Sequence, residues 1–157
     1  MQELLALSWK QNCLGFVLRR DEWIELPSFN ARKYDELWLE ILKLYPEASC
    51  SERHRLVDEA MAEAVVGDLI KLGLREVHTT AETAAVGTIA MKIGTSGLFS
   101  DFHFAIKAVF DGEICWLHKP GRLPVDIMFD EEIGADTWRQ GDYVTRTKYF
   151  QFISKGG

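Results

Sequence analysis

The chain has no cluster of basic residues and no long apolar run. Its 18 Lys and Arg are spread over 157 residues with a net charge of −6, so the basic patch typical of nucleic-acid-binding proteins is missing. The apolar runs are far shorter than the roughly 20 residues that span a bilayer, and the N-terminus lacks the pattern of a signal peptide. We therefore expect no nucleic-acid partner, no membrane span, and synthesis in the cytoplasm without a signal peptide.

Cysteine is also scarce. Cys13, Cys50 and Cys115 are an odd number and form no C-x-x-C pair, which disfavours both a disulfide framework and a zinc ribbon. Free thiols are expected. With 47% hydrophobic residues, a chain of this length can build one well-packed core and is too short for two ordinary domains. We predict a single domain over residues 1–157.

The first half of the chain has helical patterns. One helix is predicted to begin near Cys13, directly after Asn12, which is a good N-cap. A second is predicted over 32–45, where the apolar residues share one face. A third is predicted over 49–73, because "SCSE" fits a capping box at its start and Gly73 is a good stop.

After Gly73 the pattern changes to alternating, β-branched and aromatic segments, which predict strands. These segments are 74–79, 87–93, 102–110, 113–118, 125–129 and 143–153. The Asp111–Gly112 pair is a strong hairpin signal. Helices followed by strands predict an α+β domain in which N-terminal helices pack on a mostly antiparallel sheet. The acidic run 130–132 lacks the spacing of a calcium loop and is expected to be a solvated loop.

Cys13 is the first residue with candidate chemistry. In the first turn of a helix, the free amides and the helix dipole stabilise a thiolate, and a neighbouring imidazolium would add to this effect. The alternative is that Cys13 is a small apolar residue that packs under the sheet, since unpaired cysteines are among the most buried residues.

Two histidines lie on the predicted hairpin. His103 alternates with Phe102 and Phe104, so the histidine and the phenylalanines take opposite faces. A turn at 111–112 places 103–104 opposite 118–119, which makes His103 and His118 cross-strand neighbours. We expect the helix that begins near Cys13 to pack on the face that carries His103. The alternative is that each histidine is half-exposed and has no catalytic role.

These three residues resemble a known family. A cysteine at the start of the first helix, a strand opening "H-x-A-I" at His103 and a following strand "WLHKPG" with His118 are similar to the papain-like fold of NlpC-type cell-wall peptidases. The segment "GTIAMKI" (87–93) resembles the strand that precedes the histidine in that family, with Thr88 where Asp is usual. The resemblance implies a papain-like fold with Cys13 as nucleophile, His103 as general base and His118 as the residue that orients the base.

The chemistry of such a triad is amide hydrolysis through an acyl-enzyme. The backbone N–H of Cys13 would hold the oxyanion together with a second donor, for which Gln11 and Asn12 are the candidates. No cofactor or metal is expected. A zinc site of His103, His118 and Cys115 is disfavoured, because an alternating strand puts Cys115 and His118 on opposite faces.

The sequence is compatible with three functions. The resemblance implies cleavage of amide bonds in peptidoglycan peptides, with a peptide or peptidoglycan fragment as substrate. Such substrates lie outside the cytoplasm, so delivery by a phage or a secretion system would reconcile them with the missing signal peptide. The second function is a deamidase or protease effector, for which an immunity or delivery protein is a candidate partner. The third is a non-enzymatic binding domain with structural histidines.

Overall fold

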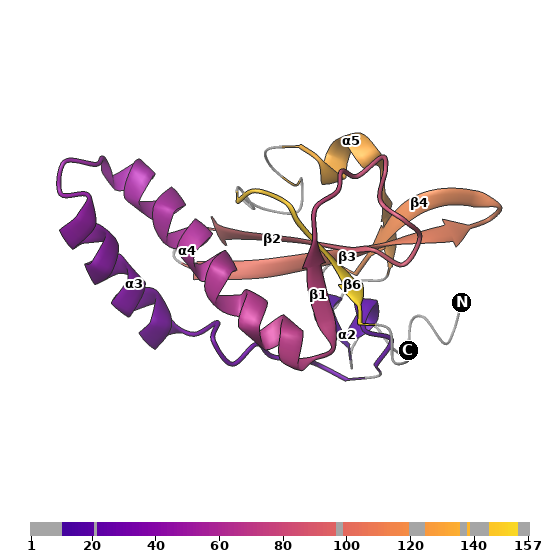
Figure 1. The fold of residues 1–157 in the computed structure, drawn as a ribbon, viewed down its shortest axis with the longest axis horizontal. Helices are drawn as coiled ribbons and strands as arrows, with labels where there is room; N and C mark the ends of the chain where they lie inside the picture. The colour runs from indigo at the N-terminus through magenta and orange to yellow at the C-terminus, as the bar shows by residue number, and fades with distance from the viewer. Residues whose placement is uncertain are drawn as a thin grey trace.

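The fold is built around one six-stranded antiparallel sheet (Figure 1). The computed structural model describes residues 11–20, 22–96, 99–119, 125–135, 138 and 145–153. The strands are β1 (Leu74–Val77), β2 (Ile89–Ser96), β3 (Phe99–Phe110), β4 (Glu113–His118), β5 (Asp126–Met128) and β6 (Lys148–Phe152), in the spatial order β1-β6-β2-β3-β4-β5. The predicted α+β class with an antiparallel sheet is confirmed.

Four helices lie in the described part of the chain. They are α2 (Cys13–Val17), α3 (Ala31–Leu44), α4 (Cys50–Lys71) and α5 (Asp130–Ile133). The two predicted caps are confirmed: the Asn12 side chain accepts from the N–H of Gly15, and the Ser49 hydroxyl accepts from that of Glu52. None of these helices combines the length and the apolar composition that crossing a bilayer requires.

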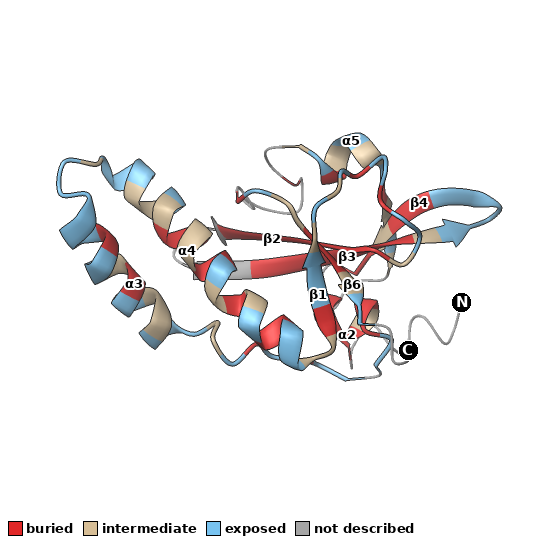
Figure 2. Ribbon diagram, viewed as in Figure 1, coloured by how far each residue is buried: buried red, intermediate tan, exposed pale blue. Residues whose placement is uncertain are grey.

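The sheet separates two layers. Seen edge-on, α2 lies below β2 and β3 and α5 lies above them, while α3 and α4 lie side by side at one end (Figure 1). One apolar cluster joins α2, α3 and α4 to the lower face of the sheet, and a second covers the upper face beneath α5. Figure 2 shows that β2 is buried, whereas the tip of the β3–β4 hairpin is exposed.

Helix α2 packs on the face opposite to the one predicted. Cys13 belongs to the same apolar cluster as Phe102 and Phe104, whereas His103 lies on the α5 side, against Trp138. The physical reason is the alternation of β3: its phenylalanines offer more apolar area than the face with His103, and an apolar helix buries the larger area. The expectation that α2 covers the face of His103 is therefore wrong.

The hairpin turns where it was predicted, but its register differs. Asp111 and Gly112 both have positive φ, 52° and 78°, as a two-residue turn of type I′ requires. Pairing then runs from Phe110 opposite Glu113 to Ala105 opposite His118. The predicted pairing of 103–104 with 118–119 is off by one residue, because the two-residue turn at 111–112 places Phe110 opposite Glu113 and hence Ala105 opposite His118.

The acidic run 130–132 forms helix α5 and is not the expected loop. Asp130 accepts a hydrogen bond of 2.9 Å from the indole N–H of the buried Trp116, and the ammonium of Lys107 lies 4.0 Å away. The acid at the start of the helix therefore accepts the hydrogen bond of one polar group of the sheet below it and attracts the charge of another. This anchors α5 to the upper face.

Gly15 is required where α2 meets the loop that follows it. A Cβ at this position would lie 2.1 Å from the carbonyl oxygen of Glu22 and 3.3 Å from that of Arg20. Gly15→Ala should therefore lower the free energy of unfolding by about 2 kcal/mol, the usual cost of overpacking. Gly67, inside α4, has no atom within 4 Å of such a Cβ, so Gly67→Ala should raise stability by about 0.5–1 kcal/mol. Urea unfolding measures both, and equal shifts would contradict the packing of α2.

Candidate functional site

The two histidines are in direct contact. His103 Nε2 and His118 Nδ1 are 2.8 Å apart, and their ring planes are nearly perpendicular, at 86°. His118 is paired with Ala105, so the two imidazoles meet as diagonal neighbours. Both rings are buried. The predicted contact between the histidines is thus present, although the register that produces it is different.

Burial decides the charge of His103. Two causes lower the pKa of His103 to about 3: the larger is desolvation by burial, and the smaller is electrostatic repulsion by His118. The ring is therefore neutral near pH 7. A contact between two imidazoles at 2.8 Å then needs a proton on one nitrogen and a lone pair on the other. Since Nε2 of His103 is used in this bond, Nδ1 is the nitrogen through which His103 would act on a thiol.

Cys13 lies beside the backbone of β3. Its Sγ is 3.8 Å from the carbonyl oxygen of Phe102, the residue before His103. The N–H of Lys107 donates to the carbonyl oxygen of Thr88, so the backbone groups of Lys107 point toward β2. The backbone groups of successive residues in a strand point alternately to its two sides. Phe102 is five positions from Lys107, so its carbonyl points to the other side, toward β4. The sulfur therefore lies on that side of β3.

Among the described residues, the last pair of β4 with β3 is His118 opposite Ala105. The thiol of Cys13 lies beyond this pair, on the β4 side of Phe102, while the His103 ring lies on the α5 side. The structure thus joins the two histidines directly and brings Cys13 to the backbone next to His103. The catalytic roles of the three residues stay predictions.

Lys119 is a charged group that the sequence interpretation missed. It is buried directly after His118, and burial lowers its pKa while the negative charge of a Cys13 thiolate raises it. The two side chains therefore interact electrostatically, and the ammonium of Lys119 favours the thiolate. The feature of the sequence that could have identified Lys119 is its position in "WLHKPG", next to one of the candidate histidines.

The side chains proposed for the oxyanion are engaged in local hydrogen bonds. The amide of Asn12 caps α2 and donates to the carbonyl of Ile24 at 2.7 Å. That of Gln11 donates to the carbonyl of Arg20 at 2.8 Å. These bonds hold the chain on either side of Cys13 in place. Whether either amide serves an oxyanion stays a prediction.

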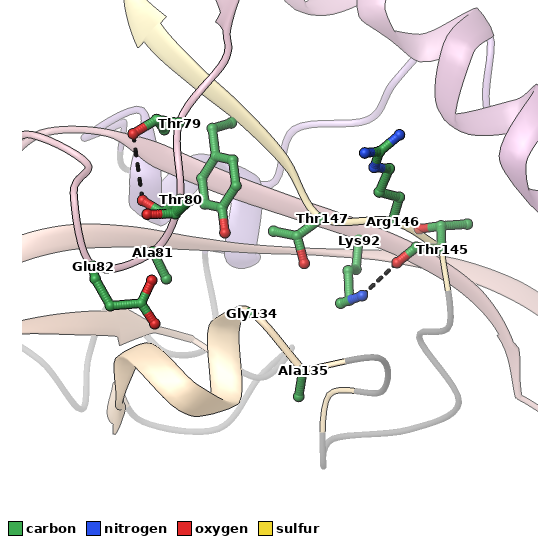
Figure 3. Close-up of a pocket in the computed structure, with 11 residues that line it drawn as sticks. Thr79, Thr80, Ala81, Glu82, Lys92, Gly134, Ala135, Thr145, Arg146 and Thr147 are labelled. Carbon is green, nitrogen blue, oxygen red and sulfur yellow. Dashed lines mark hydrogen bonds between the residues drawn. The ribbon is translucent and has the colours of Figure 1, made fainter.

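A cavity of about 530 Å³ opens on the α5 side of the sheet (Figure 3). It is lined by residues of 79–82, β2, the end of α5 and 145–149. Lys92 lines it and is the strand partner of His103, and its ammonium donates to the carbonyl of Thr145. Figure 3 shows Lys92 and Glu82 on opposite sides of the cavity. Its size suits a small ligand, and the charged residues that line it, Glu82, Lys92 and Arg146, favour a polar one.

The other cysteines lie away from the histidines. Cys115 pairs with Ala108 and lies on the face opposite to His118, as predicted. Burial raises the pKa of Cys115, which favours the unreactive thiol. Cys50 is exposed at the start of α4. In the described residues, no group of three His, Cys, Asp or Glu is placed to hold a metal ion.

The low pKa of His103 predicts a pH-dependent stability. An unfolded histidine takes up a proton near pH 6.5, whereas folded His103 resists protonation down to about 3. The free energy of unfolding should therefore fall as the pH drops, by about 2 kcal/mol from this group between about pH 7 and pH 5. Urea unfolding at both pH values measures it. His103→Gln should remove that part of the slope, whereas replacing the exposed His78 should not. An unchanged slope in His103→Gln would contradict the buried neutral ring.

Comparisons with protein-family models, with curated proteins and with solved structures gave no match to this chain. The α+β fold and the contacts among the candidate residues are therefore described from its own sequence and structure. No relative assigns an activity or a substrate to the site, so its function is inferred from its own residues and from the family resemblance of their motifs.

Proposed function

We propose that this protein is a cysteine-dependent amide hydrolase with a papain-like, NlpC-type active site. The observation that carries the proposal is the 2.8 Å contact between His103 Nε2 and His118 Nδ1, next to the backbone of Phe102 that Cys13 contacts. Two buried imidazoles in contact are costly unless each satisfies the other. Thiol activation requires a base within reach of the sulfur, and the contact of Cys13 Sγ with the carbonyl oxygen of Phe102 supports this role for the next residue, His103.

The reaction would begin with proton transfer from Cys13 to His103 Nδ1, because Nε2 is held by His118. The thiolate attacks the carbonyl carbon of an amide, and the oxyanion is held by the backbone N–H of Cys13 and a second donor. Protonated His103 then gives its proton to the leaving amine as the C–N bond breaks. A water molecule, deprotonated by His103, hydrolyses the thioester and restores the thiol.

The proposed role of Lys119 is to make the first step feasible. His103 alone is a weak base, because burial and His118 lower its pKa to about 3. Formation of the thiolate changes that balance, since a negative sulfur beside the ring stabilises the imidazolium. The buried ammonium of Lys119 stabilises the same thiolate. In the resting site His103 is then neutral, and Lys119 raises the fraction of Cys13 that is present as thiolate.

The proposed substrate is a peptide of peptidoglycan, as the resemblance to NlpC-type enzymes implies. The polar cavity next to His103 supports a charged peptide, because it carries Lys92 at one side and Glu82 at the other. Peptides of the cell wall carry both amino and carboxyl groups.

The first test is amide hydrolysis by variants of the triad. Cys13→Ser and His103→Ala should each abolish turnover of a peptidoglycan fragment, because nucleophile and base act as a unit. His118→Ala should cost on the order of 100-fold less, and His118→Asn should restore part of that loss. His78→Ala is the matched control and should keep full activity. Folding is checked by circular dichroism, and a folded, fully active His103→Ala protein would refute the mechanism.

The second test is thiol reactivity, which needs no substrate. Iodoacetamide should modify Cys13 ahead of Cys50 and Cys115 near neutral pH, since the thiolate fraction controls the rate. Lys119→Met should slow the labelling of Cys13 and leave that of the exposed Cys50 unchanged. Mass spectrometry of tryptic peptides measures the three rates. Equal rates at all three thiols in the folded protein would remove the chemical support for an enzyme.

A further inference from the structure

A third polar side chain continues the line of the two imidazoles across the sheet. Asp126 on β5 lies opposite His118 on β4, and His118 contacts His103 on β3. We propose that Asp126 is a positioning residue that sets the order of protons in the two imidazoles and so keeps His103 Nδ1 unprotonated. The role of that nitrogen as a base rests on the proposed function, whereas the proton order can be measured without it.

The geometry directs the carboxylate of Asp126 to the far nitrogen of His118. Its Oδ2 lies 4.0 Å from His118 Nε2. Its other oxygen, Oδ1, accepts a hydrogen bond of 2.8 Å from the N–H of Ile127, which fixes the orientation of the carboxylate. The side chain of Asp126 is 62% exposed, whereas that of His118 is fully buried. The carboxylate thus stays at the solvent edge and acts on the inner ring by its charge.

Two neutral imidazoles joined by one hydrogen bond have two proton orders. In the first, His103 Nε2–H donates to His118 Nδ1, and His118 carries its proton on Nε2, toward Asp126. In the second, His118 Nδ1–H donates to His103 Nε2, and the lone pair of His118 Nε2 faces Asp126. A carboxylate attracts an N–H and repels a lone pair, so Asp126 favours the first order.

The first order is the one that a base at His103 requires. When His103 carries its proton on Nε2, its Nδ1 has a lone pair that can accept the proton of Cys13. In the second order Nδ1 is protonated and cannot accept it. At 4.0 Å the contact between Asp126 and His118 is longer than a direct hydrogen bond. Asp126 therefore biases the tautomers through its charge and takes no proton itself.

Nitrogen NMR of the histidine rings tests the proton order directly. In ¹⁵N-histidine-labelled protein near neutral pH, His103 and His118 should each show a protonated Nε2 and an unprotonated Nδ1. Asp126→Asn should shift both rings toward protonated Nδ1, and Asp126→Glu should retain the parent pattern because it keeps the charge. Glu113→Gln, which removes an exposed carboxylate at the other end of β4, is the control and should change neither ring. Circular dichroism checks folding, and Asp126→Ser serves as a second variant without the charge.

Two results would overturn the proposal: protonated Nδ1 in the parent rings, or an unchanged pattern in both Asp126→Asn and Asp126→Ser.

Hydrolysis supplies the second readout. Asp126→Asn should lower kcat by about tenfold with KM unchanged, since it alters the base and not binding, and Asp126→Glu should recover most of this loss. If the NMR pattern changes as expected but the parent protein hydrolyses no amide, the proton order stands and the proposed function fails. If hydrolysis depends on Cys13 and His103 but not on Asp126, the proposed function stands and the proposal for Asp126 fails.

Discussion

Strand β3 has to bury two chemically different faces at once. Phe102 and Phe104 form an apolar surface on one side, while His103 and Lys107 are buried on the other. The apolar side needs only close packing, which α2 and the other helices of that layer provide. The polar side is costly unless each group has a partner, so its cover has to supply acceptors at defined places. The site residues follow from this second requirement.

Lys107 shows how the polar side organises its own cover. Its ammonium donates to the carbonyls of Ala81 and Glu82 at 2.7 and 3.1 Å and lies 4.0 Å from Asp130. One buried lysine thereby ties both the 79–82 loop and α5 to the sheet. Breaking one partner of such a group leaves a buried charge, which is far more destabilising than losing a surface contact. The cover over the upper face is held by these few polar bonds as well as by apolar packing.

The sequence could predict what depends on neighbouring residues. The cap at Asn12, the helix start at Ser49 and the turn at Asp111 are local, and all three are confirmed. The face chosen by α2 was predicted wrongly, because it depends on which side of a distant strand offers more apolar area. The place of Asp126 opposite His118 could not be predicted either, since it follows from the register of β5 against β4, which the sequence of the connection between them does not specify.

The place of the Cys13 thiol follows from the direction of the β3 backbone. The carbonyl of Phe102 points to the β4 side, and Cys13 Sγ lies 3.8 Å from its oxygen, beyond the last described pair of β4, His118 opposite Ala105. His103 turns its ring to the other face of the sheet, where it contacts His118 and the low local dielectric strengthens their hydrogen bond. The alternation of β3 thus assigns the thiol and the imidazoles to different faces, and the backbone between Phe102 and His103 is what relates them.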